Sequence, residues 1–233
     1  MKIRIKFSKT ASMKFIGHLD LMRYFQKAMR RADVDSAYSA GYSPHQIMTF
    51  ASPLGLGATS VGEYMDIEVN STKSSKEMVK VLNQVMVEGI EIFSYLALTE
   101  DSKNAMSLVA AADYMVMFKN SCTIDTGELN KRTEEFYNQE SITIIKKTKK
   151  SEKEVDIKPM IYSMDRAEDG QAIYLKLATG SVNNLKPTLV MEALSQFLNI
   201  PFDEFSIQVH RLDLFANDDT TLISLEELGE EIE

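Results

Sequence analysis

Apolar and polar side chains alternate along residues 2–8, with Ile3, Ile5 and Phe7 on one side and the cations on the other. This period of two is typical of a half-buried β-strand. Over residues 18–32 the apolar positions recur every three or four residues, which predicts an amphipathic helix. The remaining elements of the first half are two extended segments, a strand, a helix and a strand: 36–42, 46–52, 62–69, 75–88 and 90–98. Condensed to a strand, a helix, a strand pair, a helix and a strand, this order is the βαββαβ, or ferredoxin-like, plan.

The same order recurs beyond a polar linker over residues 99–106. The pattern predicts strands over 108–119, 141–147, 154–164, 171–178 and 205–215, with helices that begin at Asp125 and Pro187. We therefore expect an α+β protein of two tandem ferredoxin-like (βαββαβ) domains with mainly antiparallel sheets. The first spans residues 1–99, the second is an elaborated version over 107–216, and an acidic tail that is frayed or mobile follows over 217–233.

In the ferredoxin-like plan the helices cover one face of each sheet and leave the other face free. If the helices cover Ile3, Ile5 and Phe7, then Arg4 and Lys6 lie on the free face. The first domain would then present cations to solvent.

The composition is that of a folded protein, because 44% of the 233 residues are hydrophobic and can bury real cores. No run approaches the roughly 18 apolar residues of a membrane span, and the alternating N-terminus is unlike a signal peptide. Cys122 is the single cysteine, a small hydrophobic residue near a predicted strand end. One cysteine excludes an internal disulfide and a thiolate-ligated zinc or iron–sulfur site within this chain. We expect a cytoplasmic protein with no membrane partner.

The net charge of -8 is unevenly distributed. Residues 1–60 carry nine Lys and Arg against three Asp, a net charge of +6, so the remaining residues carry -14. A cationic region attracts polyanions locally, although solvated faces or contacts with the acidic half would also account for it. The candidate phosphate-binding cations are Arg4, Lys6, Lys9, Lys14, Arg23, Lys27, Arg30 and Arg31.

Two histidines and two tyrosines mark a candidate recognition loop in the same region. Its residues are His18, Asp20, Tyr38, Tyr42 and His45. Histidine titrates near neutral pH and serves as a general acid or base, and aromatic rings stack on unpaired bases. Two alternatives stay open: the histidines hydrogen-bond their own loops, and the rings close the core. We expect these side chains and the cations to converge in one solvent-facing groove.

Motifs for cofactors or metals do not occur in the sequence. The turn Gly55-Leu56-Gly57 lacks the Gly-Lys-Ser/Thr of a phosphate-binding loop and the third glycine of a dinucleotide-binding loop. The histidines lack the spacing of a zinc site, and no Gly-x-Ser-x-Gly nucleophile motif occurs. We expect no cofactor and no metal.

Several segments together resemble the radical-SAM-linked protein family, an uncharacterised bacterial domain. The resemblance rests on Phe7-Ser8-Lys9, Phe15 to Arg23, Tyr38 to His45, Phe50 to Leu54, Gly62-Glu63-Tyr64, Asn184 to Pro187 and Arg211. Proteins of this family are fused to radical SAM proteins or encoded beside them. The resemblance thus implies a radical SAM partner, often with a cobalamin-type domain, in a setting of RNA modification or ribosome-related genes. This chain cannot itself be the radical enzyme, because its cluster needs three cysteines.

Three hypotheses follow. The leading one is a non-catalytic adaptor that binds tRNA, rRNA or a ribosome-related substrate for a separate radical SAM protein. The second is a metal-independent endoribonuclease resembling CRISPR repeat-processing enzymes. In it, His18 or His45 is the acid or base, and Lys14 or Arg23 stabilises the phosphorane. The third is a protein-interaction module whose free sheet face docks the radical SAM partner.

Overall fold

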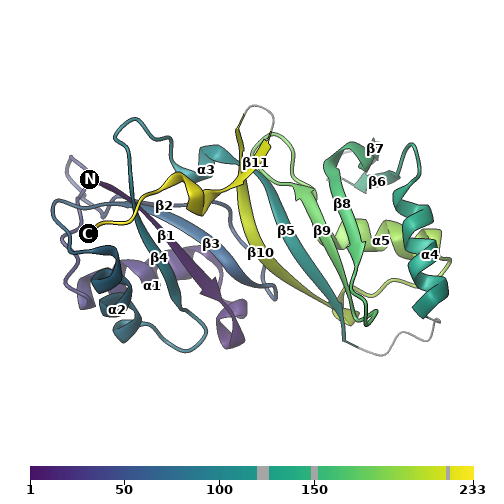
Figure 1. Ribbon diagram of the computed structural model, residues 1–233, viewed down its shortest axis with the longest axis horizontal. Coiled ribbons are helices and arrows are strands. Elements are labelled where there is room, and N and C mark those ends of the chain that lie inside the picture. Colours follow the sequence, from purple (N-terminus) through teal and green to yellow (C-terminus); the bar gives the residue numbers. More distant parts are fainter. Residues whose placement is uncertain (120–125, 148–151, 219–220) are drawn as a thin grey trace. The chain divides into compact units, whose positions relative to one another are not determined.

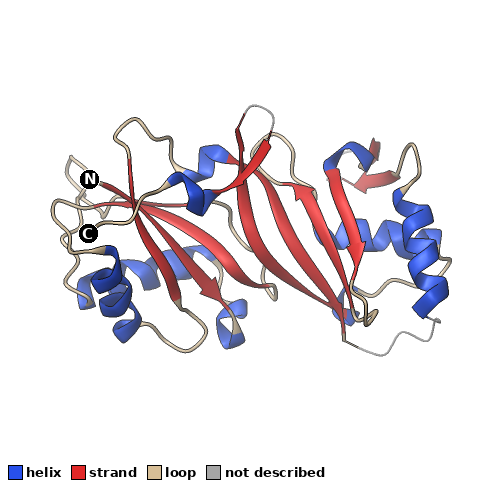
Figure 2. Ribbon diagram, viewed as in Figure 1, coloured by secondary structure: helices blue, strands red, loops and turns tan. Residues whose placement is uncertain are grey.

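The chain divides into two units that are joined through two strands. A computed structural model describes residues 1–119, 126–147, 152–218 and 221–233. Unit 1 comprises Met1–Ala110 and Arg211–Glu233, and unit 2 comprises Ala111–His210. The fold is mixed α+β with a mostly antiparallel sheet (Figure 2). Cys122, Asp125 and residues 148–151, which lie between two predicted strands, are outside the described residues.

Unit 1 contains most of the elements that the first half of the sequence predicts. Its elements are β1 (Lys2–Lys9), η1 (Ala11–Phe15), α1 (His18–Arg31), β2 (Met48–Phe50), β3 (Thr59–Glu68), α2 (Ser75–Val85), β4 (Ile92–Leu98) and α3 (Ala105–Leu108). The short helices η1 and α3 are not predicted by the sequence pattern. The strand order is β4-β1-β3, and β2 pairs antiparallel with the last part of β3. The chain leaves unit 1 within β5 (Val109–Phe118) and returns within β10 (Ile207–Asp218). After β10 come β11 (Thr221–Ser224) and η4 (Leu225–Leu228).

Helices α1 and α2 lie on one face of the unit 1 sheet (Figure 1). The core beneath them is built on the inward positions of β1 that the alternation predicts. The ring of Phe7 lies 4.7 Å from that of Phe25 in α1 and 6.0 Å from that of Phe50 in β2. Ser74 caps α2 by accepting a hydrogen bond from the Glu77 N–H. Local periodicity and capping therefore account for this layer.

The opposite face of the sheet is covered by the C-terminal segment, and the prediction of a free face is wrong. Leu225 is fully buried, and its carbonyl accepts a hydrogen bond from Arg4. Glu230 forms a β-bridge with Ala97 of the edge strand β4, and Ile232 beyond it reaches the helical side, where it packs against the core beneath α1 and α2. The predicted frayed tail is instead ordered in the described residues, because apolar side chains among its carboxylates have a surface to bury against.

Gly62 permits the close approach of β3 and β10. A Cβ atom at this position would lie 2.3 Å from the Leu212 carbonyl oxygen and 2.5 Å from the Asp213 Cα. Because both contacts are with backbone, we expect Gly62→Ala to lower the free energy of unfolding by about 1–3 kcal/mol. Urea titration would measure it. Gly55→Ala is the matched control, since a Cβ atom at Gly55 would meet no atom within 4 Å; equal losses in the two variants would contradict the argument.

Unit 2 has its own strand order, β5-β9-β8, all antiparallel. Its elements besides β5 are α4 (Thr126–Tyr137), β6 (Thr143–Lys147), β7 (Glu152–Asp156), η2 (Lys158–Met160), β8 (Ile161–Arg166), β9 (Ala172–Ala178), α5 (Pro187–Phe197) and η3 (Glu204–Ser206). Strands β6 and β7 form a separate two-stranded sheet. The single strand predicted over 154–164 is wrong, because η2 interrupts it at Pro159, which has no N–H to donate to a strand ladder.

The predicted linker also has a different role. Residues 99–106 belong to unit 1, where Asn104 caps the short helix α3 by accepting a hydrogen bond from the Ser107 N–H. Among the helices of the described ranges, none has the length and apolar character that a bilayer crossing requires.

Candidate nucleic-acid interface

Three cations form a line along the exposed side of α1. Arg23, Lys27 and Arg30 are spaced by four and three residues, so they share one side of the helix, and all three are exposed. We call this set the α1 stripe. Asp20, one turn before it, pairs with Arg23 at 3.2 Å on the surface, a contact that contributes little to stability. The fourth predicted cation of this helix, Arg31, turns toward α2 and donates to the Val85 carbonyl at 3.2 Å.

Arg4 is buried rather than available to a ligand. Only 1% of the residue is exposed, and its Nε and Nη2 donate to Asp66 at 2.8 and 3.0 Å. The Asp66 carboxylate also accepts the Ala105 N–H. Arg4 therefore joins β1, β3, α3 and the C-terminal segment, and a phosphate cannot reach it in this structure.

Lys6 is neutralised by carboxylates of the C-terminal segment and β10. Its Nζ lies 2.7 Å from Glu226 and 3.6 Å from Asp213. The Tyr64 hydroxyl donates to Asp213, and burial, followed by the neighbouring carboxylate, raises the pKa of Tyr64. Tyr64 therefore stays a neutral hydrogen-bond donor over the physiological range. This network holds the segment that covers Lys6.

Lys9 belongs to a buried cluster of charges at the end of β1. Its Nζ donates to the Ile16 carbonyl at 2.8 Å, and burial lowers the pKa of this lysine. Glu63, which counteracts that shift, pairs with Arg211 at 2.9 Å. Burial raises the pKa of Glu63, whereas Arg211 beside it lowers that pKa. Arg211 also donates to the Ser52 carbonyl at 3.0 Å. The cluster anchors the loop after β2 to β3 and β10.

The alternation pattern of the strands predicts part of this cluster, whereas the number of cations does not. Lys9 is in phase with Ile3, Ile5 and Phe7, and Glu63 is in phase with the buried Met65 and Ile67 of β3. A charge on the apolar side of a strand needs a partner. Phase alone would have predicted that Lys9 and Glu63 are buried, but not that Arg211 would join them.

The histidines and tyrosines fall into two groups instead of one groove. His18 begins α1, and its ring lies edge-on 5.4 Å from that of Phe50. His45 lies in an exposed loop closed by the pairing of Tyr38 with Gln46, and its Nδ1 is 2.9 Å from the Ser39 hydroxyl. Strand β2 connects the two groups, because it starts two residues after Gln46 at the base of that loop and ends at Phe50, beside His18. Tyr42, at its tip, is fully exposed.

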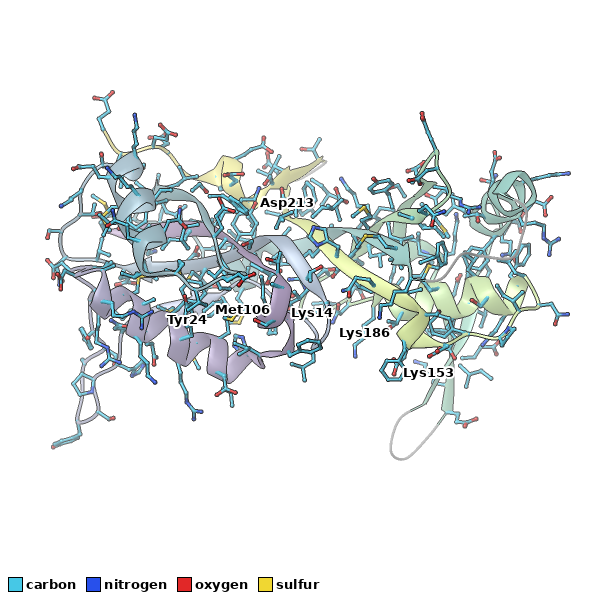
Figure 3. All side chains as sticks on the ribbon, turned by 90° about the horizontal axis from the view of Figure 1, so that it is seen from below. Lys14, Tyr24, Met106, Lys153, Lys186 and Asp213 are labelled. Atoms are coloured by element: carbon cyan, nitrogen blue, oxygen red, sulfur yellow. The ribbon has the colours of Figure 1, made fainter. Side chains whose placement is uncertain are left out.

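The expected convergence of the eight cations with the tyrosine–histidine loop is therefore wrong. Arg4, Lys6 and Lys9 are enclosed, whereas Lys14 and the α1 stripe lie on the helical side of unit 1. Figure 3 is viewed from that side, with Lys14 and Tyr24 labelled. His18 and His45 are each engaged locally, His18 by the ring of Phe50 and His45 by the Ser39 hydroxyl. Among the described residues, no group of His, Cys, Asp and Glu is arranged to hold a metal ion.

Unit 1 also contains a pocket of about 470 Å³ on the sheet face away from α1. Glu68, Asp101 and Lys103 contribute charges to its lining, and Lys2 beside them donates to the Glu100 and Ser102 carbonyls at 2.6 and 2.9 Å. Because charges of both signs are mixed there, the lining selects no particular class of ligand.

Comparisons with known proteins found a matching bacterial family and a solved structure with a similar fold. Residues 2–187 match the family described as "Uncharacterized protein conserved in bacteria (DUF2344)". The chain belongs to this family. A comparison with curated proteins found no match. A chain in the structure titled "Crystal Structure of a Cbf5-Nop10-Gar1 Complex" is similar, with a TM-score of 0.51 and 11% identity over 97% of this chain and 53% of that one. This protein thus spans about half the length of that chain, and the likeness shows the fold alone.

Proposed function

We propose that this protein is a non-catalytic accessory protein that binds RNA through the α1 stripe and Lys14. The observation that supports this proposal most is the line of three exposed cations on α1, in a chain with a net charge of -8. Cations in a line neutralise successive phosphates of a nucleic-acid backbone. The exposed carboxylates Glu227, Glu230 and Glu231 of the C-terminal segment of unit 1 repel the same backbone.

We further propose that the protein acts with a separate radical SAM protein. The support is the motif resemblance on both sides of α1, from Phe15 to Arg23 and from Tyr38 to His45. A chain with one cysteine cannot hold the three-cysteine cluster of such an enzyme itself. In this proposal it supplies substrate binding, and the substrate is tRNA, rRNA or a ribosome-related RNA.

The two units are proposed to follow the ferredoxin-like plan. In unit 1 the order β4-β1-β3, with β2 on β3 and helices α1 and α2 in the connections, agrees with it. In unit 2 the order β5-β9-β8 agrees when the β6–β7 sheet is regarded as an insertion. The Lys119 N–H donates to the Ser206 carbonyl, which places the start of β10 beside the end of β5.

The salt dependence of RNA binding tests the proposal. With four phosphates neutralised by Lys14 and the α1 stripe, the logarithm of the affinity should fall against the logarithm of salt concentration with a slope of about -3. Fluorescence anisotropy with a labelled single-stranded RNA would measure it. Binding that is absent at low salt, or that does not change with salt, would contradict the proposal.

A pull-down with and without RNase separates the proposal from its rivals. If the radical SAM partner stays bound after RNase and no RNA co-purifies, the protein is an interaction module. The endoribonuclease hypothesis has less support, because His18 packs on Phe50 while His45 bonds Ser39 in a different loop. RNA cleavage in EDTA that disappears in His18→Ala or His45→Ala would restore it.

A further inference from the structure

Three large apolar side chains are exposed at the start of α1. Phe15 is 69% exposed, Leu19 is 61% exposed and Leu56 is 71% exposed. We call them the helix-start cluster. Single exposed apolar side chains are common on proteins, but a group of them beside cations marks a place where another molecule binds.

Contacts within unit 1 bring these residues from three segments to one place. The Gly57 N–H donates to the Lys14 carbonyl at 2.9 Å, so the turn that carries Leu56 lies against η1. Phe15 ends η1, and Leu19 follows in the first turn of α1. Phe15 and Leu19 therefore lie on either side of the N-terminal end of α1, and the turn that carries Leu56 lies beside η1.

The cluster is continuous with the cations of the proposed RNA site. The Lys14 Nζ lies 5.2 Å from the centre of the Phe15 ring. Leu19 precedes Arg23 by four residues, so it stands on the same side of α1 as the stripe. A strand bound along the stripe would reach Leu19 and then Phe15 at the start of the helix.

We infer that the helix-start cluster is a stacking site for an unpaired base of RNA, with Phe15 as the platform, an inference that rests on the proposed function. An exposed aromatic ring beside cations is the arrangement with which proteins bind single strands, since the ring stacks on a base while cations hold its phosphates. Bases in a duplex are already stacked, so only an unpaired base can lie on Phe15. A protein partner is a poorer fit, because the centre of protein interfaces is depleted in charge.

Tryptophan fluorescence tests the inference directly. The chain has no tryptophan, so Phe15→Trp introduces a single reporter at the platform. Titration with a single-stranded RNA of about ten nucleotides should quench its emission as a base stacks on the indole ring. Phe205→Trp is the matched control, because Phe205 in unit 2 is another phenylalanine, 76% exposed. The emission of this control variant should not change.

Affinities of alanine variants provide the second measurement. Phe15→Ala should weaken binding of the single-stranded RNA by about 10-fold or more, while Phe205→Ala leaves it unchanged. Binding of a duplex RNA of the same length should not depend on Phe15. Since Phe15 is exposed, its removal should leave the fold intact.

The outcomes separate this inference from the proposed function. If RNA binds with the expected salt dependence but leaves the emission of the Phe15→Trp variant unchanged, the stacking site is wrong and RNA binding stands. If the wild-type protein binds no RNA, both fail. If RNA leaves that emission unchanged while the radical SAM partner alters it, the cluster is a protein-docking surface and the inference is overturned.

Discussion

Charge reversal of the α1 stripe by Arg23→Glu, Lys27→Glu and Arg30→Glu is expected to weaken RNA binding by more than about 100-fold at low salt. Each charge-assisted contact with a phosphate contributes more than about 1 kcal/mol, and three such contacts are replaced by repulsion. The salt slope should fall in magnitude by about 2, at roughly 0.7 for each phosphate lost. Anisotropy titrations at several salt concentrations would measure both quantities. The three side chains are exposed, so the variant should fold.

A control with the same change in net charge shows whether position matters. Lys131→Glu, Lys153→Glu and Lys186→Glu also reverse three exposed cations, all of them in unit 2. If binding depends on the α1 stripe, the control variant should retain affinity within a few fold of the wild-type protein. Equal losses in the two variants would mean that RNA responds only to the overall charge, and the proposed interface would be wrong.

Asp66→Ala is expected to lower the free energy of unfolding of unit 1 by about 3–5 kcal/mol. The substitution leaves the Arg4 guanidinium buried at 1% exposure without its carboxylate, and it removes the acceptor of the Ala105 N–H. Desolvation of an uncompensated charge is the larger part of this loss. Urea denaturation followed by circular dichroism would measure it.

Two further variants test whether burial is the cause. Asp20→Ala removes the carboxylate of a pair whose side chains are 67–69% exposed, and it should cost less than about 1 kcal/mol. The double variant Arg4→Met with Asp66→Leu removes both charges and should recover most of the lost stability. If Asp66→Ala and Asp20→Ala lowered the free energy of unfolding equally, burial of the Arg4–Asp66 pair would not be the cause of the loss.

The number of basic residues in a stretch of sequence does not show which of them are exposed and able to bind a ligand. Lys6 alternates outward from β1, yet Glu226 lies 2.7 Å from it. Lys9 is adjacent to the predicted loop, yet only 1% of it is exposed. Arg23, Lys27 and Arg30 keep their exposure because no described segment of unit 1 covers that side of α1. An exposed helix face is thus better evidence for a ligand site than a count of basic residues.

Elements with a local pattern are predictable from the sequence. The alternation along residues 2–8 and the helical spacing over 18–32 predict β1 and α1, because each pattern depends on neighbours within a few residues. The same locality explains why η2 was missed, since a strand pattern on both sides of Pro159 conceals the break.

What lies against each face of the sheet depends on long-range packing and is not predictable from the sequence pattern. Arg4 and Leu225 are 221 residues apart in the sequence, and Glu63 and Arg211 are 148 apart, yet each pair is joined by a hydrogen bond. Periodicity indicates which side of a strand is apolar, but it carries no information about a distant segment that covers the polar side. The acidic C-terminal segment covers the polar side of β1 because Leu225 gains burial there while Glu226 pairs with Lys6. That packing left the helical side of unit 1 as the cationic surface.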